Sequence, residues 1–371
     1  MMISMRFFSM RAFLLITLIF LISWPFKNVM SAVSDDLLIN GSYYKKITTM
    51  QDLIADILPP PCYIIESYLV VMQILDEMDK RGGADQNRIK SLLEYGKNLE
   101  NGPEGYLARL KFWSDELKDF ENIKDLLVNK AAAPAKEFYK VRDGAWAEAV
   151  NAGKREVANK IARTELKKFY EEHRKIVDQI VAMANKEQAS LEKVAQEKAA
   201  SGKKDEIVIK GALYKKIMNL KDVVNDILPP PKYIIELYLV SLMVIDELEI
   251  GNKEKANEWF EYGKKLIEGS GGYNERQEYW LKTLAGQSGE EAKIKDLMCK
   301  QSTDAATNFF TTYKGNFATA IKDLNLVQAR ITARKDLKNA YESHRKVIDE
   351  LVVLATKTYK NIENEVAAKL K

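Results

Sequence analysis

The sequence predicts an all-α protein, made of two tandem antiparallel helical bundles that follow an N-terminal signal segment. One observation is the composition, because a chain of 371 residues that is 46% hydrophobic and 30% charged can form a buried core and is not wholly disordered. A second is the scarcity of turn residues, since 18 glycines and 9 prolines are few for an all-β fold with many turns. The third is a long internal repeat.

The first 32 residues have the pattern of a secretory signal peptide. Two arginines precede the apolar run AFLLITLIFLISWPF at 12–26, which is shorter than the ~20 residues that a helix needs to cross a bilayer. Ser31 and Ala32 follow as a small-residue cleavage region. The alternative is an uncleaved anchor that begins at Phe7. Both alternatives place the rest of the chain outside the cytoplasmic membrane, either periplasmic or secreted, or held at the membrane by its N-terminus.

Most of the remaining chain is one domain present twice. Residues 41–72 and 211–242 are identical at 19 of 32 aligned positions, at a constant offset of 170. Later, LKKFYEEHRKIVDQIVAMANK at 166–186 is matched by LKNAYESHRKVIDELVVLATK at 337–357. The copies keep the same order of blocks over about 150 residues, which indicates tandem duplication of a whole domain. The predicted domains are 33–200 for copy 1 and 201–371 for copy 2.

The helices follow from the spacing of apolar residues and from helix breakers. Tyr170, Val177 and Ala184 recur at helical intervals with charged residues between them. The proline triplets at 59–61 and 229–231 end one helix and begin another, since proline lacks the amide donor. Burial of one apolar stripe per helix supplies most of the expected stability. Turns are expected at the glycine clusters 82–83, 102–105 and 270–272. A long charged helix is expected at about 155–198, and the only β-rich run of the sequence is at 207–209.

The charge of the body disfavours nucleic-acid binding. The formal net charge of +4 comes mostly from the first 32 residues, which hold three basic residues and no acidic one. The remainder carries 54 basic and 53 acidic residues, interspersed along the chain. Because a nearly neutral surface attracts a phosphate backbone only weakly, we expect no nucleic-acid partner.

No catalytic or metal-binding motif is evident, so we expect a non-enzymatic protein without a cofactor. The chain lacks a P-loop, HExxH, GxGxxG, a nucleophile elbow and a Ser-His-Asp order. Cys62 and Cys299 each occur in one copy only, which excludes a catalytic thiol shared by both copies and leaves their pairing with each other open. Each copy has one histidine, and no visible cluster supplies the three or four ligands of a metal ion.

The first candidate binding site is a stripe of aromatic residues and arginine that both copies keep. Its members, at i, i+3 and i+7, are Tyr106, Arg109 and Trp113 in copy 1 and Tyr273, Arg276 and Trp280 in copy 2. Arginine binds a carboxylate with two parallel hydrogen bonds, and aromatic neighbours exclude water or stack on it, which suits an anionic small molecule. In the alternative interpretation the rings belong to the core and the arginine extends outward.

The second candidate is the motif His-Arg-x-x-x-Asp, which begins at His173 and at His344. Its arginine and aspartate are four residues apart and can pair on one helical face, which contributes ~0.3–0.5 kcal/mol when the pair is exposed. The histidine lies nearer the apolar stripe. It either contacts a ligand inside the bundle or is a core histidine that is hydrogen-bonded to a neighbouring helix.

The third candidate follows the proline triplets. Its residues are Tyr63, Glu66 and Tyr68 in copy 1 and Tyr233, Glu236 and Tyr238 in copy 2. The glutamate falls in the first turn of a helix, where a carboxylate offsets the helix dipole by ~0.3–1 kcal/mol, and this explains it without a ligand. In the functional interpretation, the prolines fix the start of the helix and thereby hold the tyrosines at the mouth of a pocket. Tyr63 and Tyr233 would lie nearest to the ligand.

Together these blocks resemble the extracytoplasmic sensor region of bacterial methyl-accepting chemotaxis proteins. The resemblance rests on LPPPxYIIE, present at 58–66 and 228–236, and on the later YxxRxx[F/Y]W and YExHRxxxD blocks. It covers 35–186 and 205–357, and it implies a periplasmic ligand-binding module from a Gram-negative bacterium. Such receptors continue into a second transmembrane helix, a relay domain and a cytoplasmic coiled coil, and we expect none of these in this protein. We therefore expect a binding protein that passes its ligand-bound state to another receptor.

Two functions from different classes are consistent with the sequence. The leading hypothesis is an exported, non-enzymatic sensor or binding protein for a small anionic or carboxylate ligand, with a membrane receptor as its partner. Binding would shift the relative packing of helices. The alternative is a structural or adaptor helical bundle in the periplasm that binds a partner protein. In that case the repeated motifs only maintain the fold, and the aromatic and arginine stripe is packed or faces outward with no cavity beside it.

The leading hypothesis predicts that at least one compound binds and stabilises the mature protein in a calorimetric or thermal-shift screen. The screen covers small carboxylates, amino acids and inorganic anions. Arg109→Ala and Arg276→Ala should each weaken binding in their own copy, because each removes the cation expected to hold the anion. A broad library in which no compound stabilises the protein would count against ligand binding.

Overall fold

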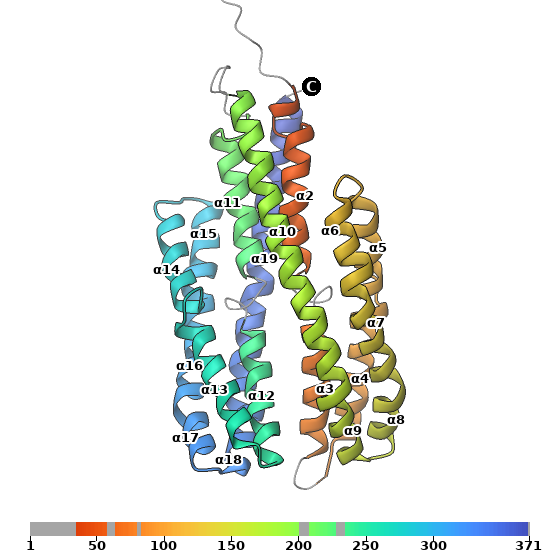
Figure 1. The fold of residues 1–371 in the computed structure, drawn as a ribbon. Helices are drawn as coiled ribbons and strands as arrows, with labels where there is room; N and C mark the ends of the chain where they lie inside the picture. The colour runs from red at the N-terminus through yellow and green to blue at the C-terminus, as the bar shows by residue number, and fades with distance from the viewer. Residues whose placement is uncertain (1–34, 58–63, 80–82, 200–207, 228–233, 370–371) are drawn as a thin grey trace, which may run out of the picture.

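The computed structural model describes residues 35–57, 64–79, 83–199, 208–227 and 234–369, which form an all-α fold (Figure 1). Over these ranges there is no β-strand. The only strand-like contact among them is one isolated antiparallel bridge, which joins Leu38 of copy 1 to Val208 of copy 2. The predicted all-α class is therefore confirmed. The proposed signal segment, both proline triplets and the candidate residues that directly follow them, Tyr63 and Tyr233, lie outside the described residues.

Copy 1 has nine α-helices within the described ranges, and copy 2 repeats them in the same order. In copy 1 they are α2 (Ser42–Ile57), α3 (Ile65–Met78), α4 (Gln86–Asn101), α5 (Tyr106–Glu116), α6 (Glu121–Asp125), α7 (Ala132–Val141), α8 (Ala147–Asn151), α9 (Arg155–Ile161) and α10 (Lys167–Ala199), after a 3-10 turn, η1 (Asp35–Leu37). In copy 2 they are α11 (Ala212–Ile227), α12 (Ile235–Glu249), α13 (Lys253–Glu268), α14 (Tyr273–Thr283), α15 (Glu290–Asp296), α16 (Ser302–Thr312), α17 (Ala318–Lys322), α18 (Leu326–Thr332) and α19 (Lys338–Lys369).

Three π-helical turns interrupt the long helices of each copy at equivalent places. They are η2 (Leu126–Ala131), η3 (Arg142–Trp146) and η4 (Ala162–Leu166) in copy 1, and η5 (Leu297–Gln301), η6 (Tyr313–Phe317) and η7 (Ala333–Leu337) in copy 2. Single π turns are rare and frequently occur at functional sites, because they change the direction of side chains along a helix. Here η4 and η7 carry Arg163 and Arg334, which bind the other copy.

The helix boundaries follow from local chemistry. The predicted charged helix is present as α9, η4 and α10 in direct succession. Asp85 caps α4, since its side chain accepts hydrogen bonds from the backbone N–H groups of Asn87 and Arg88 at 3.0 and 3.1 Å. Two of the predicted glycine turns require the left-handed backbone, with φ of +105° at Gly83 and +72° at Gly271. The third lies between α4 and α5, as expected.

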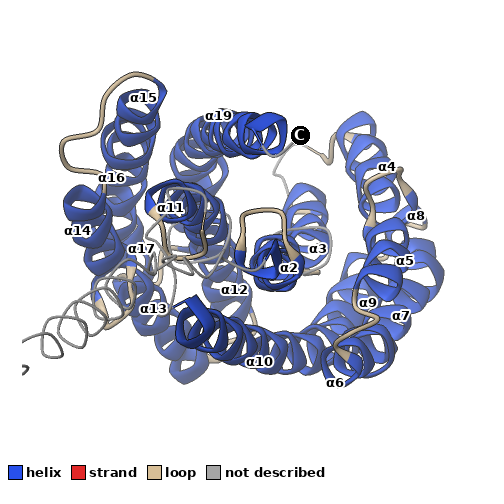
Figure 2. Ribbon diagram, turned by 90° about the horizontal axis from the view of Figure 1, so that it is seen from above, coloured by secondary structure: helices blue, strands red, loops and turns tan. Residues whose placement is uncertain are grey.

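The two copies form elongated bundles that pack side by side along their length (Figure 1). Helices α2 and α11 contact each other towards one end of the molecule, and α3 and α12 towards the other. Helix α10 packs along α2, and α19 packs along α11. Seen from above, α10 and α19 lie on opposite sides of a central row that contains α2 and α11 (Figure 2). The helices α4 to α9 and α13 to α18 form the two outer walls.

The core is shared between the copies. Helices α3 and α12 are apolar almost all round, and 11 of 14 and 13 of 15 of their residues are buried. A helix of this kind needs neighbours on every side. One continuous cluster of buried residues accordingly contains side chains from both copies. A smaller cluster in copy 1 joins α2, α5 and α10 through residues such as Met50, Trp113 and Val177.

Each copy repeats the same internal packing. Tyr68 stacks on Tyr170 with ring centroids 5.0 Å apart, and the equivalent Tyr238 stacks on Tyr341 at 5.1 Å. Phe138 and Phe309 also occupy equivalent positions, and each is fully buried. The duplicated sequence therefore produces equivalent core packing in the two copies.

This equivalence predicts equal sensitivity of the two copies to loss of a core ring. Phe138→Ala and Phe309→Ala should each lower the free energy of unfolding by about 3–5 kcal/mol, because each leaves a cavity. Phe112→Ala serves as the control, since Phe112 is 43% exposed and its loss should cost less than about 1 kcal/mol. Denaturant unfolding followed by circular dichroism measures all three, and a buried-ring variant as stable as the control would contradict the core assignment.

Candidate functional site

The aromatic and arginine stripe is divided between core and surface. Tyr106 and Trp113 are buried, at 1% and 2% exposure, and so are Tyr273 and Trp280. Arg109 is partly buried, with its guanidinium 4.5 Å from the exposed ring of Phe112 and 3.9 Å from Glu104. Copy 2 repeats this arrangement, because Arg276 lies 4.5 Å from the ring of Tyr279. The tyrosine and tryptophan rings therefore belong to the core, and each arginine packs on an exposed aromatic ring beside them.

Both histidines are inside the bundles. His173 is fully buried, its Nδ1 lies 2.9 Å from the carbonyl oxygen of Ala131, and its ring meets the edge of Tyr106. His344 is buried in the same way beside Tyr273. His173 therefore has the position expected of a core histidine bonded to a neighbouring helix, at the end of π turn η2.

The arginines that follow these histidines reach the other copy. Arg345 of copy 2 lies 2.6 Å from the carboxylate of Glu66 in copy 1 and donates to the Tyr95 hydroxyl at 3.1 Å. Tyr95 itself donates to Glu66 at 2.5 Å. The sequence suggested Asp178 and Asp349 as partners of these arginines and a helix-dipole role for Glu66, and it missed this contact between copies.

The same arrangement occurs a second time with the copies exchanged. Arg174 of copy 1 lies 2.6 Å from Glu236 of copy 2, and it donates to the Tyr262 hydroxyl at 2.7 Å. Tyr262 donates to Glu236 at 2.8 Å. Both glutamates are buried, and burial together with the adjacent carboxylate raises the pKa of Tyr95 and of Tyr262 to about 12. The two tyrosines are therefore neutral hydrogen-bond donors.

A second layer of ion pairs lies further along the interface. Arg334 on η7 of copy 2 pairs with Asp76 on α3 of copy 1 at 2.7 Å. Arg163 on η4 of copy 1 pairs with Asp246 on α12 of copy 2 at 2.5 Å, and also with Glu247 at 3.2 Å. The π turns η4 and η7 thus direct their arginines towards carboxylates on the most apolar helix of the other copy.

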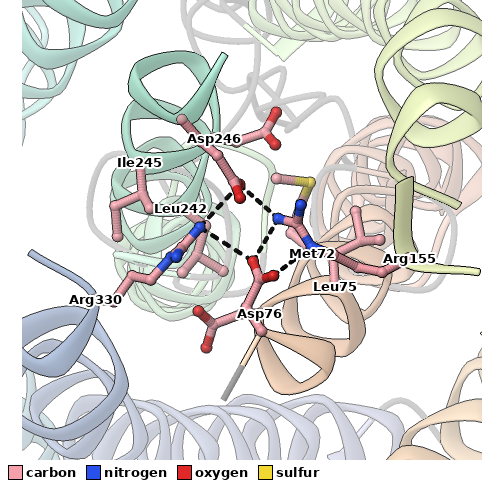
Figure 3. Close-up of a pocket in the computed structure, with 10 residues that line it drawn as sticks. Met72, Leu75, Asp76, Arg155, Leu242, Ile245, Asp246 and Arg330 are labelled. Atoms are coloured by element: carbon pink, nitrogen blue, oxygen red, sulfur yellow. Dashed lines mark hydrogen bonds and ion pairs between the residues drawn. The ribbon is translucent and has the colours of Figure 1, made fainter. Parts of the chain in front are cut away.

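A four-residue cluster ends the interface (Figure 3). Figure 3 shows that Arg155 of copy 1 and Arg330 of copy 2 enter from opposite sides. Each of these arginines pairs with both Asp79 and Glu249, which the figure does not label. The cluster borders a cavity of about 20 Å³, enough for one water molecule. Its apolar lining is Met72 and Leu75 from copy 1 and Leu242 and Ile245 from copy 2.

An open cleft of about 690 Å³ adjoins this cluster and is lined by both copies. Its lining residues are Arg155, Glu156, Asn159, Lys160, Arg163 and Thr164 from α9 and η4, and Glu247, Glu249 and Ile250 from the end of α12. The cleft therefore mixes three cations with three carboxylates. Arg155, Arg163 and Glu249 belong both to the cleft and to the ion pairs between the copies.

The copies differ at this cleft. The positions of Glu156 and Lys160 correspond in copy 2 to Val327 and Ile331, which are exposed apolar residues on α18. A polar ligand is therefore better matched by the copy 1 side, and the cleft marks a place where the duplicated domains have diverged.

Burial controls the ionisation of the interface carboxylates. Removal from water raises the pKa of Asp246 to about 6, although Arg163 and a hydrogen bond from Asn159 oppose the shift. Burial also raises the pKa of the equivalent Asp76, against the pull of Arg334. For Glu249, burial acts in the upward direction, but hydrogen bonds from Arg155 and Arg330 outweigh it and lower the pKa.

Three further observations bear on function. Within the described ranges, no helix is both long and apolar enough to cross a bilayer. Over the same part of the chain, no three His, Cys, Asp or Glu side chains are grouped to hold a metal ion. Comparisons with known proteins give no relative, since no protein-family model, no curated protein and no solved structure matches the chain.

The carboxylates of the interface were not predicted from the sequence, although a signal for them was present. Asp76 and Asp246 are identical at offset 170 and interrupt the most apolar helix of each copy. Arg163 and Arg334 are likewise identical at offset 171. A charge that both copies keep inside an apolar run predicts a buried partner, because an unpaired buried charge is strongly unfavourable.

The raised pKa of Asp246 predicts a pH dependence of stability. Because the folded pKa is about 6 against an ordinary value of 3.8, the folded chain binds more protons than the unfolded chain between these values. Asp246 therefore makes the protein less stable as pH rises from about 4 to 6.5, by roughly 2–3 kcal/mol.

Asp246→Asn should remove this contribution, because an amide cannot ionise. The difference in unfolding free energy between wild type and variant should change by that amount across the interval, measured by urea unfolding at several pH values. Asp304→Asn removes one exposed carboxylate and is the matched control. A difference for Asp246→Asn that stays constant with pH would contradict the prediction.

Proposed function

We propose that the chain is an exported, non-enzymatic sensor or binding protein of the type found in the extracytoplasmic region of chemotaxis receptors, and that its ligand occupies the cleft between the two copies. The observation that carries this proposal is that the cleft is lined by both copies and shares residues with the ion pairs between them. The signal segment and the motifs that resemble chemoreceptor sensor regions support the export and the sensory role.

The position of the cleft supplies a route from binding to a change of shape. Arg155 and Glu249 form part of the cluster that ends the interface, and Arg163 pairs with Asp246 beside it. A ligand that contacts these groups competes with their contacts between the copies. Binding would then favour one relative placement of the copies over another, which is the differential affinity that a two-state mechanism requires.

The lining residues suggest the chemistry of the ligand. Arg155, Lys160 and Arg163 offer cations for a carboxylate, and Thr164 lies beside them. Glu156 and Glu247 face the same cleft and suit an ammonium or hydroxyl group. A small compound that carries a carboxylate together with a second polar or cationic group fits this set. Arg109 and Arg276 lie on the outer walls and line neither of the two cavities.

A direct test is isothermal titration of the mature protein with amino acids, hydroxy acids and dicarboxylates identified by thermal shift. Lys160→Glu should weaken binding at least about tenfold, because it reverses the charge of a cleft residue. Lys136→Glu makes the same change at an exposed position outside the cleft and should leave the affinity unchanged. Loss of binding in Arg109→Ala with normal binding in Lys160→Glu would place the ligand elsewhere.

A second candidate function is an adaptor that binds a partner protein. Phe112 and Tyr279 occupy equivalent positions on the two outer walls, are 43% and 45% exposed, and each lies under an arginine. Exposed aromatic and arginine pairs are enriched at protein interfaces. A ligand screen without any hit, together with a partner lost on Phe112→Ala and Tyr279→Ala, would favour the adaptor.

A further inference from the structure

Eight polar contacts between the copies form four reciprocal pairs. Each pair joins one position of copy 1 to a position of copy 2, and the exchanged pair is also present: Glu66–Arg345 with Glu236–Arg174, Asp76–Arg334 with Asp246–Arg163, Tyr44–Glu363 with Tyr214–Glu192, and Gln51–Asp222 with Lys221–Asp52. This reciprocity is the property of an isologous interface, in which the same patch is used on both sides of a two-fold axis.

Positions that correspond to each other also meet directly, which locates the axis. The rings of Tyr44 and Tyr214 contact edge to face with centroids 6.3 Å apart. Leu38 bridges to Val208 near the start of the copies. At the other end, Asp79 and Glu249 share the same two arginines. The pseudo-symmetry therefore extends over the whole length of the interface.

The apolar part of the interface requires a second copy. Helix α3 contacts α12 across the axis, and nearly every residue of both helices is buried. A single copy in isolation would expose one side of its most apolar helix together with Asp76 and Glu66. A second copy of the same module covers this face and also supplies the arginines that neutralise the two carboxylates.

We propose that the face which each copy turns to the axis is a complete homodimer interface, fitted to a second copy of the same module and independent of the segment that connects the copies. The contacts could be made between two first copies as well, since Glu66 of one would meet Arg174 of the other. The two halves of this chain therefore behave as a dimer joined end to end. This inference does not depend on the identity of a ligand.

A cleavable form of the full chain tests the proposal. A protease recognition sequence is inserted between Gly202 and Lys203, and the folded protein is then cut. We expect the two fragments to elute together with the mass of the uncut chain in size-exclusion chromatography with light scattering, at micromolar concentration. Fragments that separate or precipitate after cleavage would overturn the proposal, because the interface would then depend on the covalent connection.

Charge reversal and its rescue test the contacts themselves. In the cut protein, Glu66→Arg with Glu236→Arg should raise the dissociation constant of the fragments at least about 30-fold, because each change places an arginine against Arg345 or Arg174 of the other copy. Adding Arg174→Glu and Arg345→Glu restores opposite charges and should recover most of the affinity. Glu137→Arg with Glu261→Arg reverses two exposed carboxylates paired within their own copies and should have no effect.

If the variant with Glu66→Arg and Glu236→Arg does not fold, the variant that also carries Arg174→Glu and Arg345→Glu still tests the proposal. Circular dichroism of the uncut proteins shows which variants are folded. If the variant with all four substitutions is folded but its fragments do not associate, these ion pairs do not hold the copies together and the proposal fails. If the control weakens association as strongly as the first variant, the effect is general electrostatics and the proposal fails.

Discussion

The structure depends on the burial of two helices that have no polar face. Helices α3 and α12 are apolar almost all round, so each must be covered by its own bundle on one side and by the other copy on the opposite side. The hydrophobic effect therefore drives the two copies together. The outer helices only need one covered face, and they form the walls on either side of this shared centre.

Buried ion pairs fix how the two apolar helices are aligned with each other. Asp76, Asp246 and the glutamates in the first turns of α3 and α12 have arginine partners in the other copy. Removal of one partner would leave a buried charge without compensation, which is far more unfavourable than loss of a surface ion pair. The π turns η4 and η7 contribute by directing Arg163 and Arg334 towards the axis.

The same charged groups connect the interface to the cleft. Arg155, Arg163 and Glu249 hold the copies together and also line the cleft. Occupation of the cleft and the relative placement of the copies are thus coupled through shared side chains. The divergence at Glu156 and Lys160, which are Val327 and Ile331 in copy 2, makes one side of the axis better suited to polar compounds than the other.

Local spacing and backbone chemistry were enough to predict the helical class, the duplication, the turns at Gly83 and Gly271 and the long helix that begins at Arg155. The role of the charged motifs could be seen only in the folded chain. Local spacing suggests Asp178 for Arg174, whereas the fold brings Glu236 to 2.6 Å. It also buries Tyr106 and Trp113 in the core and places Arg109 on the exposed ring of Phe112. Such partners lie in another copy, and nothing in a helical period encodes contacts over that separation.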